Sequence, residues 1–140
     1  MSHGGQPQSL PAMSTLIRFA TAPERRCLWR LLLVPLLAAI TWLALVPHPP
    51  EGISTGWDTA NHALAFSTLA FVCVWAQWPQ PRQWPVLFAV VLAYGGGIEI
   101  AQSFLPPRSA EWLDLLADGV GIAIGLLLAW PVTVLAARSR

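Results

Sequence analysis

The chain has 140 residues, of which 55% are hydrophobic and 11% are charged, and its formal net charge is +1. A soluble domain usually carries about 25% charged residues, so this composition argues against a soluble globular domain and favours a membrane protein. The few arginines are explained by membrane topology rather than by a basic binding patch, so we expect no nucleic acid partner.

The chain begins with a polar stretch and a first apolar segment. We predict that residues 1–27, which are rich at first in Gly, Pro, Ser and Gln, form a flexible cytosolic tail. The apolar segment at 28–46 follows Arg18, Arg25 and Arg26, an arrangement that a signal peptide also shows. The segment is long for the apolar part of a signal peptide, and no small-residue cleavage site follows it. We therefore expect an uncleaved transmembrane helix.

Three further apolar segments follow at 57–78, 84–105 and 112–135. Each is close to the ~20 residues that a helix needs to cross a hydrocarbon core of ~30 Å. An interfacial aromatic belt is expected at span ends, and five tryptophans lie there: Trp29, Trp57, Trp78, Trp84 and Trp112. The sequence predicts an all-α fold, an integral membrane four-helix bundle with short loops, over residues 28–137.

The distribution of arginine predicts the orientation of this bundle. Seven arginines precede the first segment or open it, lie between the second and third, or follow the fourth: Arg18, Arg25, Arg26, Arg30, Arg82, Arg138 and Arg140. Only Arg108 lies on the other side. Because positively charged loops stay in the cytoplasm, we predict cytoplasmic N- and C-termini, with the loops at 47–57 and 103–114 facing outward.

Polar residues gather where the apolar segments meet the outward-facing loops. Three pairs, each spaced so that its members share one helix face, are Asp58 with His62, Glu99 with Gln102, and Asp114 with Asp118. Counting ~1.5 Å per residue, Glu99 lies about 9 Å inside the segment end at Leu105, and His62 and Asp118 lie about 7 Å and about 9 Å inside the ends of their own segments. Lipid makes buried ionisable groups costly, so their convergence at one depth indicates a functional site.

Arg108 is the expected counter-charge, because it follows two prolines in a loop that can fold back over these groups. A guanidinium group binds a carboxylate or a phosphate through two parallel hydrogen bonds. We predict a polar funnel that opens outward and binds a ligand through Asp58, His62, Glu99, Gln102, Arg108, Asp114 and Asp118. The alternative is structural: Arg108 ties the third segment to the fourth, and Gln102 makes an interhelical hydrogen bond.

Five glycines have a simpler interpretation, because small residues let membrane helices approach closely. They are Gly95, Gly96 and Gly97 in the third segment and Gly121 and Gly125 in the fourth. The run of three also allows a hinge, but packing is the favoured role. The chain has no Gly-rich phosphate loop and no Cys/His cluster with zinc spacing, so we expect no metal ion and no cofactor.

Three stretches follow one another in a specific order: Asp58-Thr-Ala-Asn-His62-Ala-Leu-Ala-Phe66, Glu99-Ile-Ala-Gln102-Ser-Phe104, and Arg108 followed by Asp114, Asp118, Gly121 and Gly125. Together they resemble the VanZ-like family of small bacterial membrane proteins over residues 30–136. The family often has Lys where this chain has Thr59, and Asn where it has Asp118. It is named for a member linked to low-level resistance to the glycopeptide teicoplanin. The resemblance implies an envelope role at the outer face of the bacterial inner membrane.

Three functions are compatible with these patterns. The favoured one is binding of an anionic lipid or cell-wall-precursor head group, in envelope maintenance or in tolerance of teicoplanin-type glycopeptides. The second is an intramembrane enzyme acting on a lipid-linked envelope substrate, in which Glu99 or Asp118 is the general base and His62 the acid or proton shuttle. The third is a structural protein that acts through a membrane protein partner.

Overall fold

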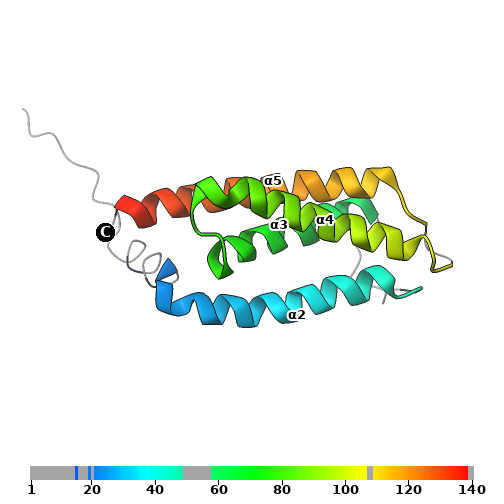
Figure 1. The fold of residues 1–140 in the computed structure, drawn as a ribbon, viewed down its shortest axis with the longest axis horizontal. Coiled ribbons are helices and arrows are strands. Elements are labelled where there is room, and N and C mark those ends of the chain that lie inside the picture. The colour runs from blue at the N-terminus through cyan, green and yellow to red at the C-terminus, as the bar shows by residue number, and fades with distance from the viewer. Residues whose placement is uncertain (1–14, 16–18, 20, 49–57, 107–108, 139–140) are drawn as a thin grey trace, which may run out of the picture.

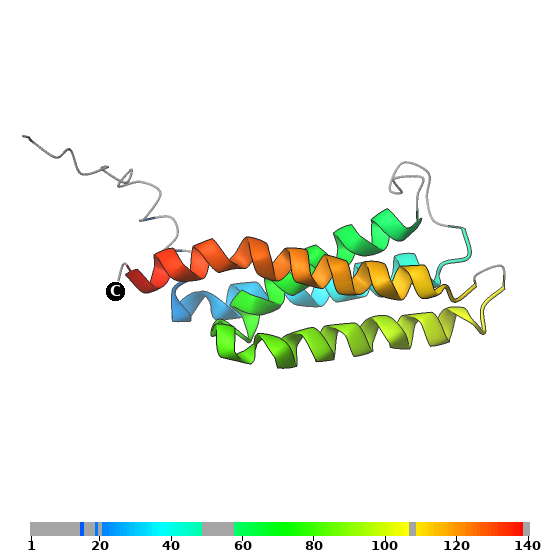
Figure 2. The same ribbon diagram turned by 90° about the horizontal axis from the view of Figure 1, so that it is seen from above.

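The computed structural model describes residues 15, 19, 21–48, 58–106 and 109–138 of the chain. Most of the predicted tail therefore lies outside the described residues. Over the part that is described, the elements are helices without any β-strand: η1 (Pro23–Arg25), α2 (Arg26–Leu45), α3 (Asp58–Ala76), η2 (Pro81–Gln83), α4 (Trp84–Gln102) and α5 (Trp112–Arg138). The four long helices run along one axis and alternate in direction along the chain (Figures 1 and 2).

The lengths of these helices match the thickness of a membrane. The shortest, α3 and α4, have 19 residues each, which corresponds to roughly 28 Å at ~1.5 Å per residue. All four are long and apolar enough to cross a membrane. The predicted all-α, four-helix membrane bundle is thereby confirmed.

The two ends of the bundle differ in charge. At one end, where α2 and α4 begin and α3 and α5 end, lie the arginines Arg25, Arg26, Arg30 and Arg82. We call this the arginine end. At the opposite end, which we call the polar end, α3 and α5 begin with Asp58 and Asp114 in their first turns.

Arg30 joins two helices at the arginine end. Its Nε donates a hydrogen bond of 3.1 Å to the carbonyl oxygen of Ala76, and a terminal guanidinium nitrogen donates one of 2.7 Å to Gln77 Oε1. The last carbonyl groups of a helix have no intrahelical donor, and a cation is favourable near them. Arg30 therefore links α2 to the end of α3.

The closest helix pair is α3 with α5, and glycine makes its approach possible. A Cβ atom placed on Gly121 would collide with the carbonyl oxygen of Ala63, and one on Gly125 would collide with that of Ser67. Small residues at such crossings let helix backbones come close. The predicted run of three glycines behaves differently: only Gly95 faces close neighbours, whereas a Cβ on Gly96 or Gly97 would meet open space.

The core lies between α3, α4 and α5, and α2 lies at its edge. The largest fully buried apolar side chains are Phe66, Leu69, Leu87, Ile122 and Val74. By contrast, α2 has one buried residue, Ile40, and a long apolar face that is exposed. A membrane helix presents such a face to lipid, because the bilayer core is itself apolar.

The helix boundaries depart from the predicted ones, most clearly at the end of α4. The helix ends at Gln102, three residues before the expected Leu105, and the chain then makes tight turns with hydrogen bonds from Phe104 N to Ala101 O (3.2 Å) and from Leu105 N to Gln102 O (2.9 Å). The following prolines cannot continue a helix. The predicted depth of Glu99 is thus too large: it lies three residues, or ~4.5 Å, from the helix end.

A candidate polar site at one end of the bundle

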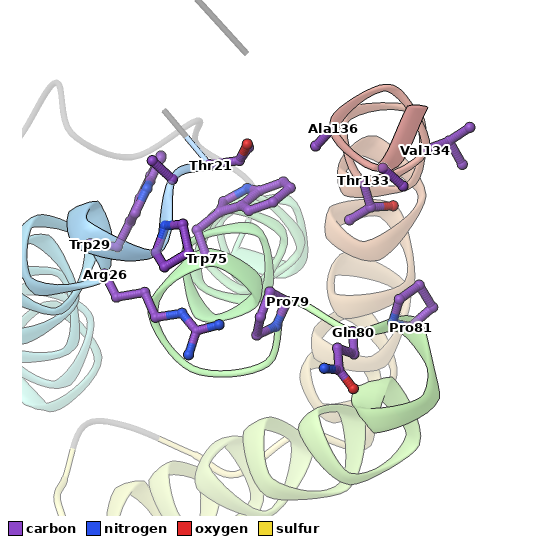
Figure 3. A pocket seen from close by; sticks show the side chains of 13 residues that line it. Thr21, Arg26, Trp29, Trp75, Pro79, Gln80, Pro81, Thr133, Val134 and Ala136 are labelled. Atoms are coloured by element: carbon purple, nitrogen blue, oxygen red, sulfur yellow. The ribbon is translucent and has the colours of Figure 1, made fainter. Parts of the chain in front are cut away.

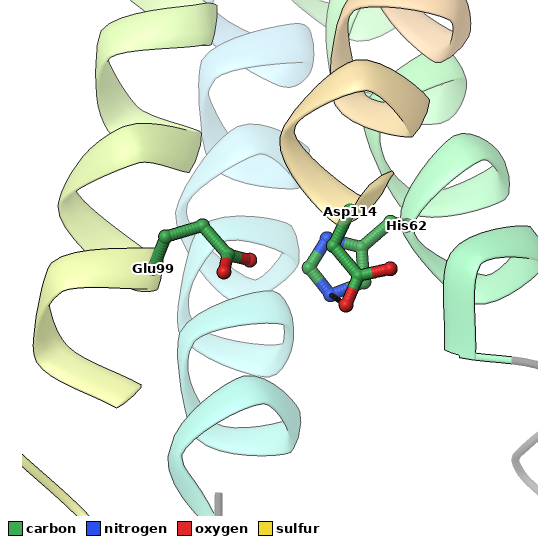
Figure 4. A group of neighbouring side chains, drawn as sticks. All are labelled: His62, Glu99 and Asp114. Atoms are coloured by element: carbon green, nitrogen blue, oxygen red, sulfur yellow. Dashed lines mark ion pairs between the residues drawn. The ribbon is translucent and has the colours of Figure 1, made fainter. Parts of the chain in front are cut away.

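Three helices bring ionisable side chains together at the polar end. His62 lies one turn into α3, Glu99 lies in the last turn of α4, and Asp114 lies in the first turn of α5. Figure 4 shows the Glu99 carboxylate extending from α4 toward the other two side chains. One ligand atom from each of the three lies within 4.8 Å of one another. We call these residues, together with Asp118, the polar cluster.

The imidazole of His62 is held in place by Asp118. His62 Nδ1 lies 2.9 Å from Asp118 Oδ1, and the Asp118 side chain is completely buried. The ring lies parallel to that of Phe66, one turn further along α3, with ring centroids 6.3 Å apart. The hydrogen bond and the neighbouring ring together fix the direction in which the other imidazole nitrogen points.

That other nitrogen faces Asp114. His62 Nε2 lies 3.9 Å from Asp114 Oδ2, while Asp114 Oδ1 accepts a hydrogen bond of 3.1 Å from the Thr59 hydroxyl. The sequence did not single out Thr59 as a site residue. The signal for it was present, because Thr59 precedes His62 by three residues and so shares its helix face.

Glu99 links α4 to the start of α5. Its side chain is buried, and Oε2 accepts a hydrogen bond of 2.9 Å from the backbone N–H of Glu111, the residue before α5. The first N–H groups of a helix have no intrahelical acceptor, and a carboxylate is favourable beside them. The second oxygen of Glu99, Oε1, is buried and has no hydrogen-bond partner within the described structure.

The second carboxylate oxygen of Asp118 is also buried. Its Oδ2 accepts no hydrogen bond from the described residues, and it lies where a Cβ on Gly95 would be. The absence of a side chain at Gly95 therefore makes room for this carboxylate and for the Phe66 ring beside it. Leaving a buried polar atom unpaired costs roughly 1–3 kcal/mol, and more when it is charged. Two such oxygens in one cluster are unusual, because buried polar atoms are generally hydrogen-bonded.

Gln102 is turned away from this cluster. Its side-chain Nε2 donates a hydrogen bond of 3.0 Å to the carbonyl oxygen of Ala44, near the end of α2. Gln102 is buried, and its Oε1 has no partner among the described residues. The contact is the interhelical hydrogen bond considered from the sequence as the alternative to ligand binding.

Two candidates of the predicted funnel remain, Asp58 and Arg108. Asp58 is exposed in the first turn of α3. At this position the partial positive charge of the helix N-terminus stabilises a carboxylate. Arg108 lies outside the described residues. The described arginine side chains are all at the other end of the bundle, so His62 is the basic group that the described structure places within ion-pair distance of these carboxylates.

A cavity of about 420 Å³ lies at the arginine end, far from the polar cluster (Figure 3). It is bounded by the start of α2, the end of α3 with the loop that follows, and the end of α5. Its lining includes Trp29, Trp75 and several prolines, with Arg26 as the charged member. No carboxylate and no histidine belongs to this lining. The cavity therefore contains none of the residue types that the sequence suggested as general acid or base.

Comparison with known proteins gives one match. The model of the VanZ/LLP1 family matches residues 12–135, a stretch that includes α2, α3, α4, nearly all of α5 and every residue of the polar cluster. No curated protein matches the chain, and no solved structure does.

Proposed function

The chain belongs to the VanZ/LLP1 family, and we propose that it is a multi-pass protein of the bacterial inner membrane that binds a head group at its polar end. The four membrane-spanning helices establish a multi-pass membrane protein. The arginines at the opposite end favour a cytoplasmic location for that end, because positively charged segments remain inside. The polar end then faces the outer leaflet, where lipid and cell-wall-precursor head groups lie.

The observation that carries this proposal is a pair of buried carboxylate oxygens, Glu99 Oε1 and Asp118 Oδ2, that have no hydrogen-bond partner among the described residues. Buried acceptors of this kind need donors. The head groups of anionic lipids and of lipid-linked precursors combine hydroxyl donors with phosphate. The polar cluster would accept hydrogen bonds from the hydroxyls, and Arg108 would hold the phosphate through its guanidinium group.

The proposal is tested by identifying the lipids that copurify with the protein. Wild type and Arg108→Ala are purified at matched amounts of folded protein, and the bound lipids are identified by mass spectrometry. We expect an anionic lipid or precursor with wild type that is depleted in Arg108→Ala. Arg82→Ala, which removes a cation from the opposite end, is the matched control and should retain the lipid. Identical lipid profiles in all three proteins would reject the head-group site.

The biological role that we propose is upkeep of the cell envelope, with tolerance of teicoplanin-type glycopeptides as one consequence. A strain that lacks the protein should then be more sensitive to teicoplanin, and Arg108→Ala should fail to restore tolerance where Arg82→Ala restores it. If the strain that lacks the protein were no more sensitive to teicoplanin, the protein would not contribute to glycopeptide tolerance. The lipid measurement would remain valid in that case.

The hydrogen bond between His62 and Asp118 supports a second candidate, an intramembrane enzyme. A carboxylate that orients an imidazole is a recurrent part of acid–base sites, and the Glu99 carboxylate lies close by. This candidate predicts turnover of a lipid-linked substrate that is abolished by Glu99→Gln while binding persists. Binding without turnover in the wild-type protein would exclude it.

A further inference from the structure

We propose that the polar cluster is a binding site for a divalent transition-metal ion, best matched by Zn²⁺. His62, Glu99 and Asp114 are the metal ligands in this proposal, and Asp118 and Thr59 orient two of them. The inference departs from the sequence-based expectation that the protein has no metal. It goes beyond the proposed head-group binding and does not depend on it, because metal binding is measured by itself.

The first argument is the donor set and its spacing. One imidazole nitrogen and two carboxylate oxygens are ligands that zinc accepts at ~2.0–2.2 Å, and three protein ligands with one open position are typical of its reactive sites. In a tetrahedral site with bonds of this length, two ligand atoms lie about 3.3–3.6 Å apart. His62 Nε2 and Asp114 Oδ2, at 3.9 Å, are within ~0.6 Å of that separation. The whole group, within 4.8 Å, reaches it when each ligand atom moves inward by less than about 1 Å.

The second argument is the unpaired oxygen of Glu99. The side chain is more than nine-tenths buried, with 7% of its surface exposed, and Oε1 has no partner among the described residues. Its carboxylate points from α4 toward His62 and Asp114 (Figure 4). A cation between the three side chains would supply the missing partner, and it would replace the head-group hydroxyl that the proposed function places at this oxygen.

The third argument is that each proposed ligand is held at one atom and leaves another available. Asp118 Oδ1 is hydrogen-bonded to His62 Nδ1, the Thr59 hydroxyl is hydrogen-bonded to Asp114 Oδ1, and the Glu111 N–H is hydrogen-bonded to Glu99 Oε2. A histidine that binds metal usually donates its other ring N–H to a carboxylate in this way, which leaves Nε2 as an acceptor for the ion. These outer contacts fix the ligands before the metal arrives.

Charge supplies the fourth argument. With a neutral imidazole and all three carboxylates of Glu99, Asp114 and Asp118 ionised, the polar cluster would carry a charge of −3. A divalent ion reduces this charge to −1, and its open position attracts a phosphate oxygen. The rival arrangement is a protonated His62 that bridges Asp114 and Asp118 without metal. It leaves Glu99 Oε1 unpaired, because both ion pairs of His62 are made to the aspartates.

The test is zinc binding by the full chain in detergent after removal of metals with a chelator. The metal-free protein is then loaded with ZnCl₂ and desalted, and its zinc content should be one ion per chain for wild type. Isothermal titration with ZnCl₂ should give the same ratio. Glu99→Gln retains an acceptor for the Glu111 N–H but loses a ligand charge, and it should lower the zinc affinity by at least about 10-fold. Asp118→Asn and Thr59→Val alter only the outer contacts. Asp118→Asn should lower the zinc affinity by about 10–100-fold, and Thr59→Val should lower it by a smaller factor.

Glu24→Gln is the matched control, because it makes the same change at an exposed acid in η1, at the arginine end. It should bind zinc as wild type does. Size-exclusion chromatography and helical circular dichroism establish that each variant is folded. Absence of zinc binding by folded wild type would overturn the proposal, as would an equal loss in Glu24→Gln and Glu99→Gln. Neither result bears on the lipid profile of Arg108→Ala, so failure of the metal site and failure of the head-group site are distinguishable.

Discussion

The hydrogen bond between His62 Nδ1 and Asp118 Oδ1, 2.9 Å long, joins α3 to α5 at a position where the carboxylate is completely buried. It lies in the same region as the closest approach of the two helices, since Gly121, three residues after Asp118, faces the backbone of Ala63, the residue after His62. Close packing of the helices and the polar contact therefore depend on each other. The side chains can meet only if the backbones approach, and the buried carboxylate is tolerated only if the imidazole reaches it.

This dependence predicts a specific pattern of stability. In chelator, His62→Leu should lower the free energy of unfolding by about 3–5 kcal/mol, because it leaves Asp118 as an unpaired buried charge. The double variant His62→Leu with Asp118→Leu should lose much less, since replacing a buried pair by apolar side chains is often nearly neutral. Denaturant titration of the purified proteins in detergent measures both. A double variant that loses as much as the two single variants added together would show that the residues are not coupled.

The sequence predicted which residues would lie at the polar end, but not which of them would touch. Four apolar segments of suitable length determine four spans, and a chain that crosses the membrane four times brings the ends of consecutive helices together. The side on which each helix presents its polar residues depends on its rotation about its own axis, and packing decides that rotation. Glu99 faces α5, whereas Gln102, one turn away, is bonded to Ala44 on α2.

The contribution of Thr59 was missed for a related reason. In the sequence, Thr59 stands out as a departure from the family pattern, and a hydroxyl at the start of a helix has many local uses. Its bond to Asp114 depends on the register of α3 against α5. That register is determined by the close approach at Gly121 and Gly125. Helix spacing places Thr59 on the same face as His62, but it does not identify Asp114 as the partner of Thr59.

The close approach of α3 and α5 predicts opposite effects for two kinds of glycine substitution. Gly121→Ala and Gly125→Ala place a methyl group against a backbone carbonyl oxygen of α3, and overpacking of this kind costs about 1–3 kcal/mol. Gly97→Ala adds the same methyl group in open space, where alanine favours a helix by up to ~1 kcal/mol. Thermal unfolding in detergent compares them. If all three variants were equally stable, the glycines of α5 would not be needed for packing.

At the arginine end, Arg30→Ala should reduce stability by about 1 kcal/mol. The substitution removes the two hydrogen bonds that link α2 to Ala76 and Gln77, and the figure is at the low end for charged hydrogen bonds because the contact with Gln77 is exposed to solvent. Arg26→Ala, which removes a cavity-lining arginine from the same end, should have a smaller effect. Denaturant titration under matched conditions measures the difference. Equal losses would indicate that arginine charge at this end, rather than the bonds of Arg30, supports the bundle.

Gly95→Ala should weaken zinc binding although Gly95 is not a ligand. The added Cβ would overlap Asp118 Oδ2 and press on the Phe66 ring, so the carboxylate that holds His62 Nδ1 must move. Loss of an outer contact to a metal-binding histidine usually costs about 10–100-fold in affinity, and we expect a loss in that range. Gly96→Ala is the control, because its Cβ meets open space one residue away. Zinc titration of both folded variants measures the two affinities. Wild-type affinity in Gly95→Ala would mean that the position of the Asp118 carboxylate does not determine how well the His62 imidazole binds zinc.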